Sequence, residues 1–218
     1  MRARVRSSPD GGQAFPFYVV AVAGLLFVAL ALFVVGQAAV TRSGAQGAAD
    51  AAALAAAREA RDRVLFGLDL AALKPEDWAK IIDADHLKSN GACTQAAVFA
   101  ARNDAKAQCE VSPPKFTVKV ESNRTVGESV IPGTDSMHGT ASATALVESK
   151  CHLDEVADPS PTPTASTGRN GPEPTPTVSL APTVIFTCGQ GGSIKVDPMK
   201  PGSLRELGRK LFSVRLVN

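Results

Sequence analysis

The apolar residues of this chain are concentrated in one uninterrupted run. No charged residue occurs from Phe15 to Val40, whereas Asp10 precedes the run and Arg42 follows it. As an α-helix, with ~1.5 Å of rise per residue, the run would be ~39 Å long. The hydrocarbon core of a bilayer is ~30 Å thick, so such a helix can cross it with some tilt. The pattern therefore predicts a transmembrane helix over residues 15–40, preceded by a cytoplasmic N-terminus, 1–14.

The helical pattern continues beyond the apolar run as an alanine-rich extension, residues 41–68. Alanine recurs every four residues in two sets, which places each set on one face of a helix, and alanine is also the best helix former. The sets are Ala45, Ala49, Ala53 and Ala57, and Ala48, Ala52, Ala56 and Ala60. Two interpretations stay open: small faces admit a partner helix closely, or they pack onto the chain's own domain.

The remainder predicts a small α+β domain in two parts, 69–157 and 183–218. Strict alternation of polar and apolar residues is typical of half-buried strands, and it occurs over 115–121 and more weakly over 140–148. Short helices are expected after Pro75, over 93–104 and after Ser203, an N-cap candidate that would form a capping box with Glu206. Further strands are expected at 184–188, 194–196 and 213–217.

Residues 158–182 differ in kind, because seven prolines alternate there with Ser, Thr and Gly. Such a composition predicts a disordered linker or loop that cannot pack a core. The expected fold is thus α+β: one long N-terminal transmembrane helix extending into a small disulfide-stabilised extracytoplasmic domain with a disordered Pro/Thr-rich loop.

Charge adds a topology to this picture. Arg2, Arg4 and Arg6 account for the net charge of +2, because Lys plus Arg equals Asp plus Glu in number beyond Asp10. By the positive-inside rule the N-terminus is cytoplasmic and the C-terminal domain lies outside a single-pass cell-membrane anchor. The basic excess therefore indicates topology and no nucleic-acid surface. A cleaved secretory signal is the alternative, although its apolar core would be shorter, ~7–15 residues.

All four cysteines, Cys93, Cys109, Cys151 and Cys188, fall on the predicted outer side. An even number in an oxidising compartment indicates two disulfides. Three pairings are possible, and proximity in sequence favours Cys93–Cys109 with Cys151–Cys188. Free thiols and a zinc site are the alternatives, but no CxxC pair occurs and the three histidines lack ligand spacing.

The sequence offers little catalytic chemistry. It contains no GxSxG, no GxxxxGK[ST] and no HExxH, the motifs of common hydrolases, nucleotide-binding proteins and zinc proteases. Three weak candidates remain: Ser136 with His138, a polar cluster of Asp83, Asp85 and His86, and the glycine-rich turn 189–192. We therefore expect no enzyme, no cofactor and no metal.

Two blocks flanking the apolar run carry a family resemblance. Asp10-Gly11-Gly12-Gln13-Ala14 precedes the run, and Gln46-Gly47-Ala48-Ala49-Asp50 followed by Ala51 to Ala57 comes after it. These blocks resemble the N-terminus of TadE/TadG-like proteins of Flp (Tad) pilus-assembly systems. The stretch with Asn103, Cys109 and Val118 to Val120 resembles the outer domain of actinobacterial members.

The resemblance implies a pseudopilin-like, non-enzymatic pilus-assembly protein. Its partners would be the membrane and pilin-like or Tad secretion-platform proteins, or further copies of the chain. In pilin-like relatives a peptidase cuts after a glycine, here between Gly12 and Gln13, with a glutamate at the fifth mature residue. Phe17 occupies that position, which favours an unprocessed anchor. A membrane-anchored extracytoplasmic binding or sensing module is the alternative function.

Overall fold

The computed structural model describes residues 14–84, 87, 90–125, 127, 133–157, 183–189 and 191–217. The predicted Pro/Thr-rich loop and the candidate processing site, Gly12 and Gln13, lie outside these residues. The helices are α1 (Ala14–Asp62), α2 (Pro75–Ile82), α3 (Ala92–Arg102) and α4 (Leu204–Leu211), with a 3-10 turn, η1 (Thr134–Ser136). The strands are β1 (Ala105–Ser112), β2 (Lys115–Thr125), β3 (His138–Ser149), β4 (Cys151–Ala157), β5 (Thr183–Cys188), β6 (Gly192–Val196) and β7 (Phe212–Val217).

A four-stranded antiparallel sheet forms the larger part of the folded domain, with the strand order β1-β2-β3-β7. Its inner face follows from the alternation in the sequence, because the buried residues of β2 are Phe116, Val118 and Val120. Thr117 and Lys119 point to the opposite face, as the period of two requires. Thr117 and Thr144 hydrogen-bond there, across β2 and β3, at 3.0 Å.

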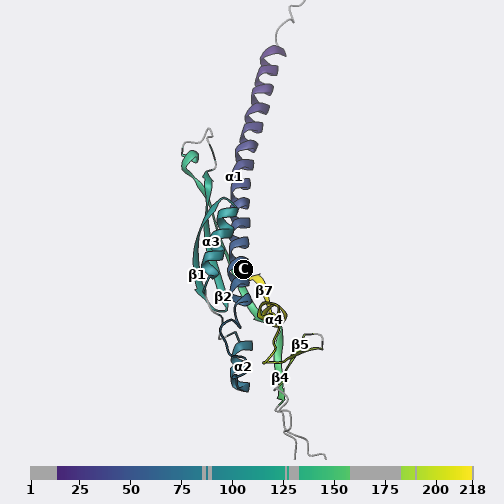
Figure 1. Cartoon of the computed structure of the whole chain (residues 1–218). Helices are drawn as coiled ribbons and strands as arrows, with labels where there is room; N and C mark the ends of the chain where they lie inside the picture. The colour runs from purple at the N-terminus through teal and green to yellow at the C-terminus, as the bar shows by residue number, and fades with distance from the viewer. Residues whose placement is uncertain are drawn as a thin grey trace, which may run out of the picture.

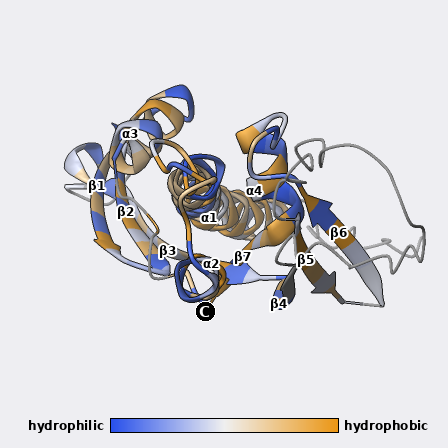
Figure 2. Cartoon of the chain, turned by 60° about the horizontal axis from the view of Figure 1, so that its bottom comes forward, coloured by the Kyte–Doolittle hydropathy of each residue, from blue (hydrophilic) through white to orange (hydrophobic). Residues whose placement is uncertain are grey.

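The second half of α1 forms the centre of the core. It contacts β2, β3, β7, α3 and α4, and these elements surround it when the molecule is viewed towards its lower end (Figure 2). The buried side chains of α3, Ala92, Ala96 and Ala100, are also alanines. Two alanine faces allow the axes of α1 and α3 to approach closely, which explains the low side-chain volume on both helices.

A smaller antiparallel sheet, β4-β5-β6, lies at the end of the molecule away from the apolar half of α1 (Figure 1). Helix α2 packs beside it through Trp78, Ile81 and Ile82. The Trp78 ring meets Phe186 of β5 edge to face, with 5.8 Å between ring centroids. The only tryptophan of the chain therefore reports on the packing of this second sheet.

The structure confirms most expected elements and corrects others. Helix α1 ends at Asp62, before the predicted end near Leu68, because the chain turns there to bury Val64 and Leu65. Strands β1 and β4 were not predicted. Ser203 is confirmed as the N-cap of α4, since its Oγ accepts a hydrogen bond from the Glu206 backbone N–H at 3.4 Å. Pro75 is the first residue of α2, as expected.

Helix α4 contacts α1 closely at a glycine, which gives a test of this packing. A Cβ at Gly208 would lie 2.8 Å from the backbone oxygen of Arg61, whereas a Cβ at Gly47 in α1 would meet nothing within 4 Å. Gly208→Ala is therefore expected to lower the free energy of unfolding by about 1–3 kcal/mol through overpacking. Gly47→Ala is expected to raise it by up to about 1 kcal/mol through helix propensity.

Urea unfolding of the full chain in detergent, followed by Trp78 fluorescence, measures both effects. The two changes are the same substitution in a helix, so Gly47→Ala is the matched control. Equal stabilisation by both would contradict the close α1–α4 contact.

Candidate functional site: the apolar helix and its junction with the domain

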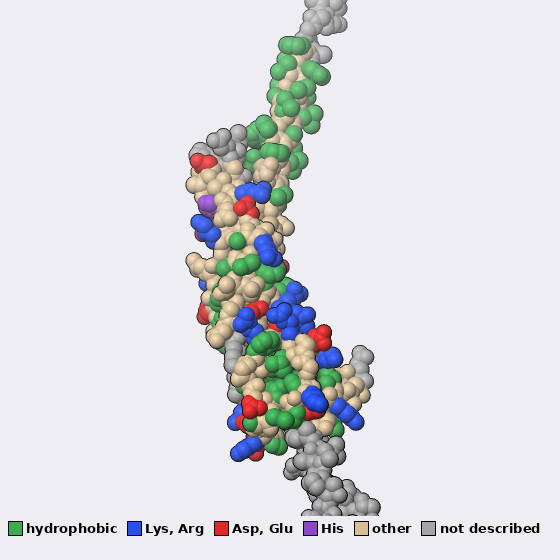
Figure 3. Space-filling view, in the orientation of Figure 1, with side chains coloured by type: hydrophobic (Ala, Val, Ile, Leu, Met, Phe, Trp, Pro, Cys, Tyr) green, Lys and Arg blue, Asp and Glu red, His purple; other side chains and the backbone are tan. Residues whose placement is uncertain are grey.

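The first half of α1 projects from the folded domain with its apolar side chains exposed. Phe15 is 72% exposed, Phe27 74% and Val40 70%, and no residue of the most apolar stretch is buried in the chain. Figure 3 shows these hydrophobic side chains extending beyond the domain. A continuous apolar surface of this size is unfavourable in water and marks a contact with membrane or protein. Helix α1 is long and apolar enough to cross a membrane.

Burial in α1 begins sharply at Ala45. The predicted set Ala45, Ala49, Ala53 and Ala57 is 1%, 0%, 0% and 0% exposed, and the second set, Ala48, Ala52, Ala56 and Ala60, is equally buried. Both sets belong to the core of the chain's own domain. Of the two interpretations of the alanine repeat, the structure shows packing within the chain. The hypothesis that these faces receive a partner helix is therefore corrected: that contact surface is already occupied.

The C-terminal end of α1 is tied to α4 by a buried carboxylate. Asp62 is 7% exposed, and its oxygens accept hydrogen bonds from the Arg61 Nη2 at 2.8 Å and the Arg209 Nη2 at 2.7 Å. Arg205 lies further out, with its Nε 3.9 Å from the carboxylate. An aspartate at a helix C-terminus is unfavourable on its own, so the arginines account for its presence there.

Burial and the arginines act on the pKa of Asp62 in opposite directions. Burial alone raises it, but the hydrogen bonds and charges of Arg209 and Arg61 together hold the pKa below its usual value of 3.8. The unfolded chain therefore binds this proton at a higher pH than the folded chain. The stability contributed by the ionised form is present above about pH 4 and is lost as the pH falls through the folded-state pKa.

Asp62→Asn is expected to lower the free energy of unfolding at pH 7 by about 2 kcal/mol, because the charge-assisted hydrogen bonds from Arg61 and Arg209 to the carboxylate are lost, while Arg209 stays half-exposed. The loss of stability between pH 5 and 3 should also become shallower than in the wild type. Urea unfolding across this pH range measures both. Asp50→Asn is the matched control, since Asp50 lies on the same helix and its carboxylate accepts a hydrogen bond from the neutral Gln46 side chain at 2.8 Å. If the free energy of unfolding of Asp62→Asn depends on pH as it does in the wild type, Asp62 does not contribute to the acid dependence of stability.

Two disulfides close the domain. Cys93–Cys109 joins α3 to β1, and Cys151–Cys188 joins β4 to β5, with Cα–Cα distances of 5.5 Å and 3.9 Å. This is the pairing that proximity in sequence favours, and it leaves no thiolate of these four for zinc. Within the described residues, no group of three or more His, Cys, Asp or Glu could hold a metal ion.

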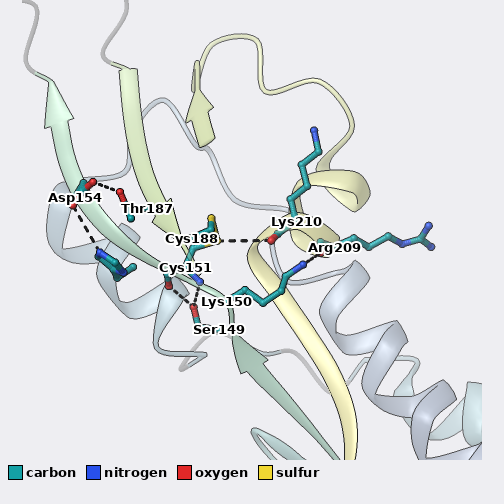
Figure 4. The surroundings of a disulfide bond; sticks show 9 residues. Ser149, Lys150, Cys151, Asp154, Thr187, Cys188, Arg209 and Lys210 are labelled. Carbon is teal, nitrogen blue, oxygen red and sulfur yellow. Dashed lines mark hydrogen bonds and ion pairs between the residues drawn. A yellow bond between two sulfur atoms is a disulfide. The ribbon is translucent and has the colours of Figure 1, made fainter. Parts of the chain in front are cut away.

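The Cys151–Cys188 disulfide lies where the small sheet meets α4 (Figure 4). The Cys151 Sγ is 3.8 Å from the Lys210 carbonyl oxygen, and the Lys150 Nζ donates a hydrogen bond to the Arg209 carbonyl at 2.7 Å. The hydrogen bonds of Lys150 therefore hold the start of β4 against the last turn of α4, while the disulfide joins β4 to β5 beside this contact. Through Arg209 this region is continuous with the Asp62 cluster.

The weak catalytic candidates are not assembled into a reactive pair. The Ser136 Oγ donates to the Gly133 carbonyl at 3.0 Å, and the His138 Nδ1 lies 2.7 Å from the Ser122 carbonyl. Each group is thus engaged with a backbone oxygen. Asp83 forms the C-cap of α2, while Asp85, His86 and Gln190 lie outside the described residues. Sequence reasoning missed the Asp62 cluster, because Arg209 is 147 positions away and no local pattern joins the two.

These features define a class: a disulfide-bonded, β-rich domain built around the second half of one helix whose first half is suited to a membrane. The comparisons then identify the N-terminal segment, because residues 12–59 match the model of the Tad family, described as Flp pilus-assembly TadE/G-like. The resemblance noted from the sequence is confirmed for this segment; its actinobacterial type stays a prediction. Neither the curated proteins nor the solved structures contain a match to this chain.

Proposed function

We propose that the protein is a non-enzymatic, membrane-anchored, pseudopilin-like component of Flp/Tad pilus assembly. The observation that carries the proposal is the family match at residues 12–59. The matched segment contains the whole exposed apolar part of α1 and most of its buried alanine part. The match therefore falls on the element that links the proposed membrane span to the folded domain. No step in this role requires bond chemistry.

The contacts with other assembly proteins are assigned to the exposed half of α1. The alanine faces are covered by the chain's own sheet and by α3. A helix of another protein could therefore pack there only if the domain opened. Residues 15–40 present large apolar side chains in all directions. Their partners are lipid and the apolar helices of pilin-like or Tad secretion-platform proteins, or of further copies of this chain.

The proposed topology places the N-terminus in the cytoplasm and the domain outside. Arg2, Arg4 and Arg6 support it through the positive-inside rule. The two disulfides support it independently, because such bonds persist in oxidising compartments. Phe17, in place of a glutamate, supports retention of the segment before Gln13.

Photo-crosslinking in living cells tests the partner assignment. A photoreactive phenylalanine analogue replaces Phe27 or Phe33, which are 74% and 63% exposed. We expect both positions to capture pilin-like or Tad secretion-platform chains, identified by mass spectrometry. The matched control places the analogue at Met199, which is 63% exposed on the far part of the domain. Capture of those chains from Met199 alone, with none from the helix, would contradict the assignment.

A further inference from the structure

Strand β3 is longer than its neighbour β7, so part of its edge has no partner strand. The register of β3 with β7 ends at Thr144, which lies opposite Val217. Strand β3 begins six residues earlier, at His138. Within the described chain, no strand lies beside residues 138–143 on the side of β7. The sheet therefore has a notch, which is the free edge of residues 138–143 in line with the end of β7.

The direction of the backbone groups in the notch follows from the hydrogen bonds of β3. Successive residues of an antiparallel strand bond to opposite neighbours. The Gly139 N–H donates to the Ser122 Oγ of β2 at 2.8 Å, and the Val147 N–H donates to the Pro114 carbonyl, directly before β2, at 3.0 Å. Odd-numbered residues of β3 thus bond towards β2, and even-numbered residues bond towards β7 or, where β7 has ended, towards the notch.

Thr140 and Ser142 therefore direct their N–H and C=O groups into the notch. Both residues are exposed, and these backbone groups form no hydrogen bond within the described chain. The space beside Ser142 is open, because a groove of about 560 Å³ is lined by this residue, by the end of β7 and by Gln46 and Asp50 of α1. An unpaired edge with room beside it is suited to pairing with one further strand.

Helix α1 forms the inner wall of the notch. A Cβ on Gly139 would lie 2.8 Å from the Thr41 backbone oxygen and 3.3 Å from the Ala45 Cβ, so only glycine permits the start of β3 to approach α1 this closely. The sheet curves around the helix (Figure 2). A strand added beside β3 would therefore face α1 with its inward side chains, where Gln46 and Asp50 line the groove.

The notch differs from the other free edges of the two sheets in its side chains. Charged residues on a free edge discourage pairing with another chain. The outer strands β1, β7, β4 and β6 each carry at least one such residue: Lys106 and Glu110, Arg215, Asp154, and Lys195, respectively. Residues 139–143 are Gly, Thr, Ala, Ser and Ala, which are small and uncharged. This part of β3 thus lacks the usual protection of an edge against pairing.

The charge in the groove indicates the chemistry of the occupant. Asp50 is partly exposed, and its carboxylate accepts a hydrogen bond from the neutral Gln46 side chain at 2.8 Å. Within the described chain no cation pairs with it. A lysine or arginine on an inward position of the added strand would supply the missing cation. A second copy that paired through its own residues 139–143 would bring none.

We propose that the notch binds an extended segment of a partner protein as an added antiparallel strand, with a lysine or arginine of that segment against Asp50. Such a strand continues the line of β7, and five of its residues, ~17 Å long, cover the free edge. Its backbone pairs with Thr140 and Ser142. The site lies in the folded domain, so it goes beyond the proposed role in pilus assembly and does not depend on it.

Hydrogen exchange of the full-length protein in detergent micelles, followed by NMR, tests whether the notch is free. The amides of Thr140 and Ser142 are expected to have protection factors about 100-fold below those of Ala141 and Ala143, which bond towards β2. Equal protection of all four amides would overturn the open edge. Protection of Thr140 and Ser142 that rises with protein concentration would place a second copy in the notch and overturn the partner segment.

Two synthetic peptides labelled with fluorescein test the chemistry of the occupant. Both alternate Thr and Val over seven residues, but the central residue is Lys in one and Glu in the other. The Lys peptide should protect the Thr140 and Ser142 amides and bind about tenfold more tightly than the Glu peptide, because Asp50 attracts one and repels the other. Asp50→Asn should remove the difference. Binding of neither peptide would overturn the site, and an unchanged difference in Asp50→Asn would overturn the role of that carboxylate.

Ser142→Pro tests the backbone pairing itself. Proline removes an N–H that faces the notch and is accepted on a free strand edge, so the fold should be retained, as Trp78 emission would show. Affinity for the Lys peptide should fall about tenfold. Ala107→Pro is the matched control, because it removes an N–H from the free edge of β1, and it should bind as the wild type does. Equal affinity of the two proline variants would overturn strand addition at the notch.

Discussion

The Leu26→Arg, Val28→Arg double variant is expected to lose its retention in the membrane fraction. Both side chains lie in the middle of the apolar run and are exposed, at 61% and 54%. Each arginine near the centre of a span costs about 3 kcal/mol on insertion scales, so the pair costs about 6 kcal/mol. That is roughly four powers of ten in the partition between membrane and water.

Carbonate extraction followed by immunoblotting measures this retention. The matched control is Ala39→Arg, Val40→Arg, which adds the same charge at the end of the run, where arginine can reach the headgroup layer. The control should stay with the membrane. Equal retention of the two double variants would contradict the assignment of residues 15–40 as the span.

Removal of the Cys151–Cys188 disulfide is expected to have the largest effect on the stability of the domain. The bond closes a separation of 37 residues, which corresponds to about 4 kcal/mol of loop-closure entropy in the unfolded chain. The Cys151→Ala, Cys188→Ala variant should therefore unfold at a much lower urea concentration. Trp78 reports this directly, because it packs on Phe186 in the strand that carries Cys188.

The Cys93→Ala, Cys109→Ala variant is the matched comparison. Its bond closes a separation of 16 residues, which corresponds to about 3 kcal/mol in the same treatment. The Cys151→Ala, Cys188→Ala variant should thus be less stable than the Cys93→Ala, Cys109→Ala variant. A Cys151/Cys188 variant as stable as the wild type would show that the disulfide does not constrain the β4–β5 region.

The local pattern of apolar and polar residues was sufficient to predict those helices and strands whose faces each have uniform surroundings. The run without charge gave the exposed half of α1, and the alternation over 115–121 gave β2. In β1 the same alternation is present, but its inward residues include the small Ala105 and Ala107, which make a weak signal. In β4 a register shift between Leu153 and Glu155 interrupts the alternation, so the sequence carries no regular period there.

The candidate contacts depended on distant parts of the chain. The alanine repeat is compatible with a partner helix or with an internal sheet, and only the three-dimensional packing of Ala53 and its neighbours distinguishes these. The ion pair of Asp62 with Arg209 likewise joins positions far apart in sequence. The contact of Gly139 with Thr41 has no local signature either. Local periodicity identifies a buried face but not what covers it.

The structure divides α1 into two halves with different surroundings. The first half exposes its apolar side chains, and in the proposed role this surface contacts lipid and partner helices; the second half forms the centre of the domain. Because the helix is continuous from Ala14 to Asp62, the orientation of the span is transmitted to the domain without a flexible joint. This mechanical continuity suits a protein that holds a domain in place during filament assembly.

The most direct test of the central claim is the number of surface filaments on cells in which the gene is deleted. We expect the deletion strain to lack Flp-type filaments while general secretion continues. The wild-type gene should restore the filaments, and the Leu26→Arg, Val28→Arg variant should not. A normal number of filaments on the deletion strain would contradict the proposed role in pilus assembly.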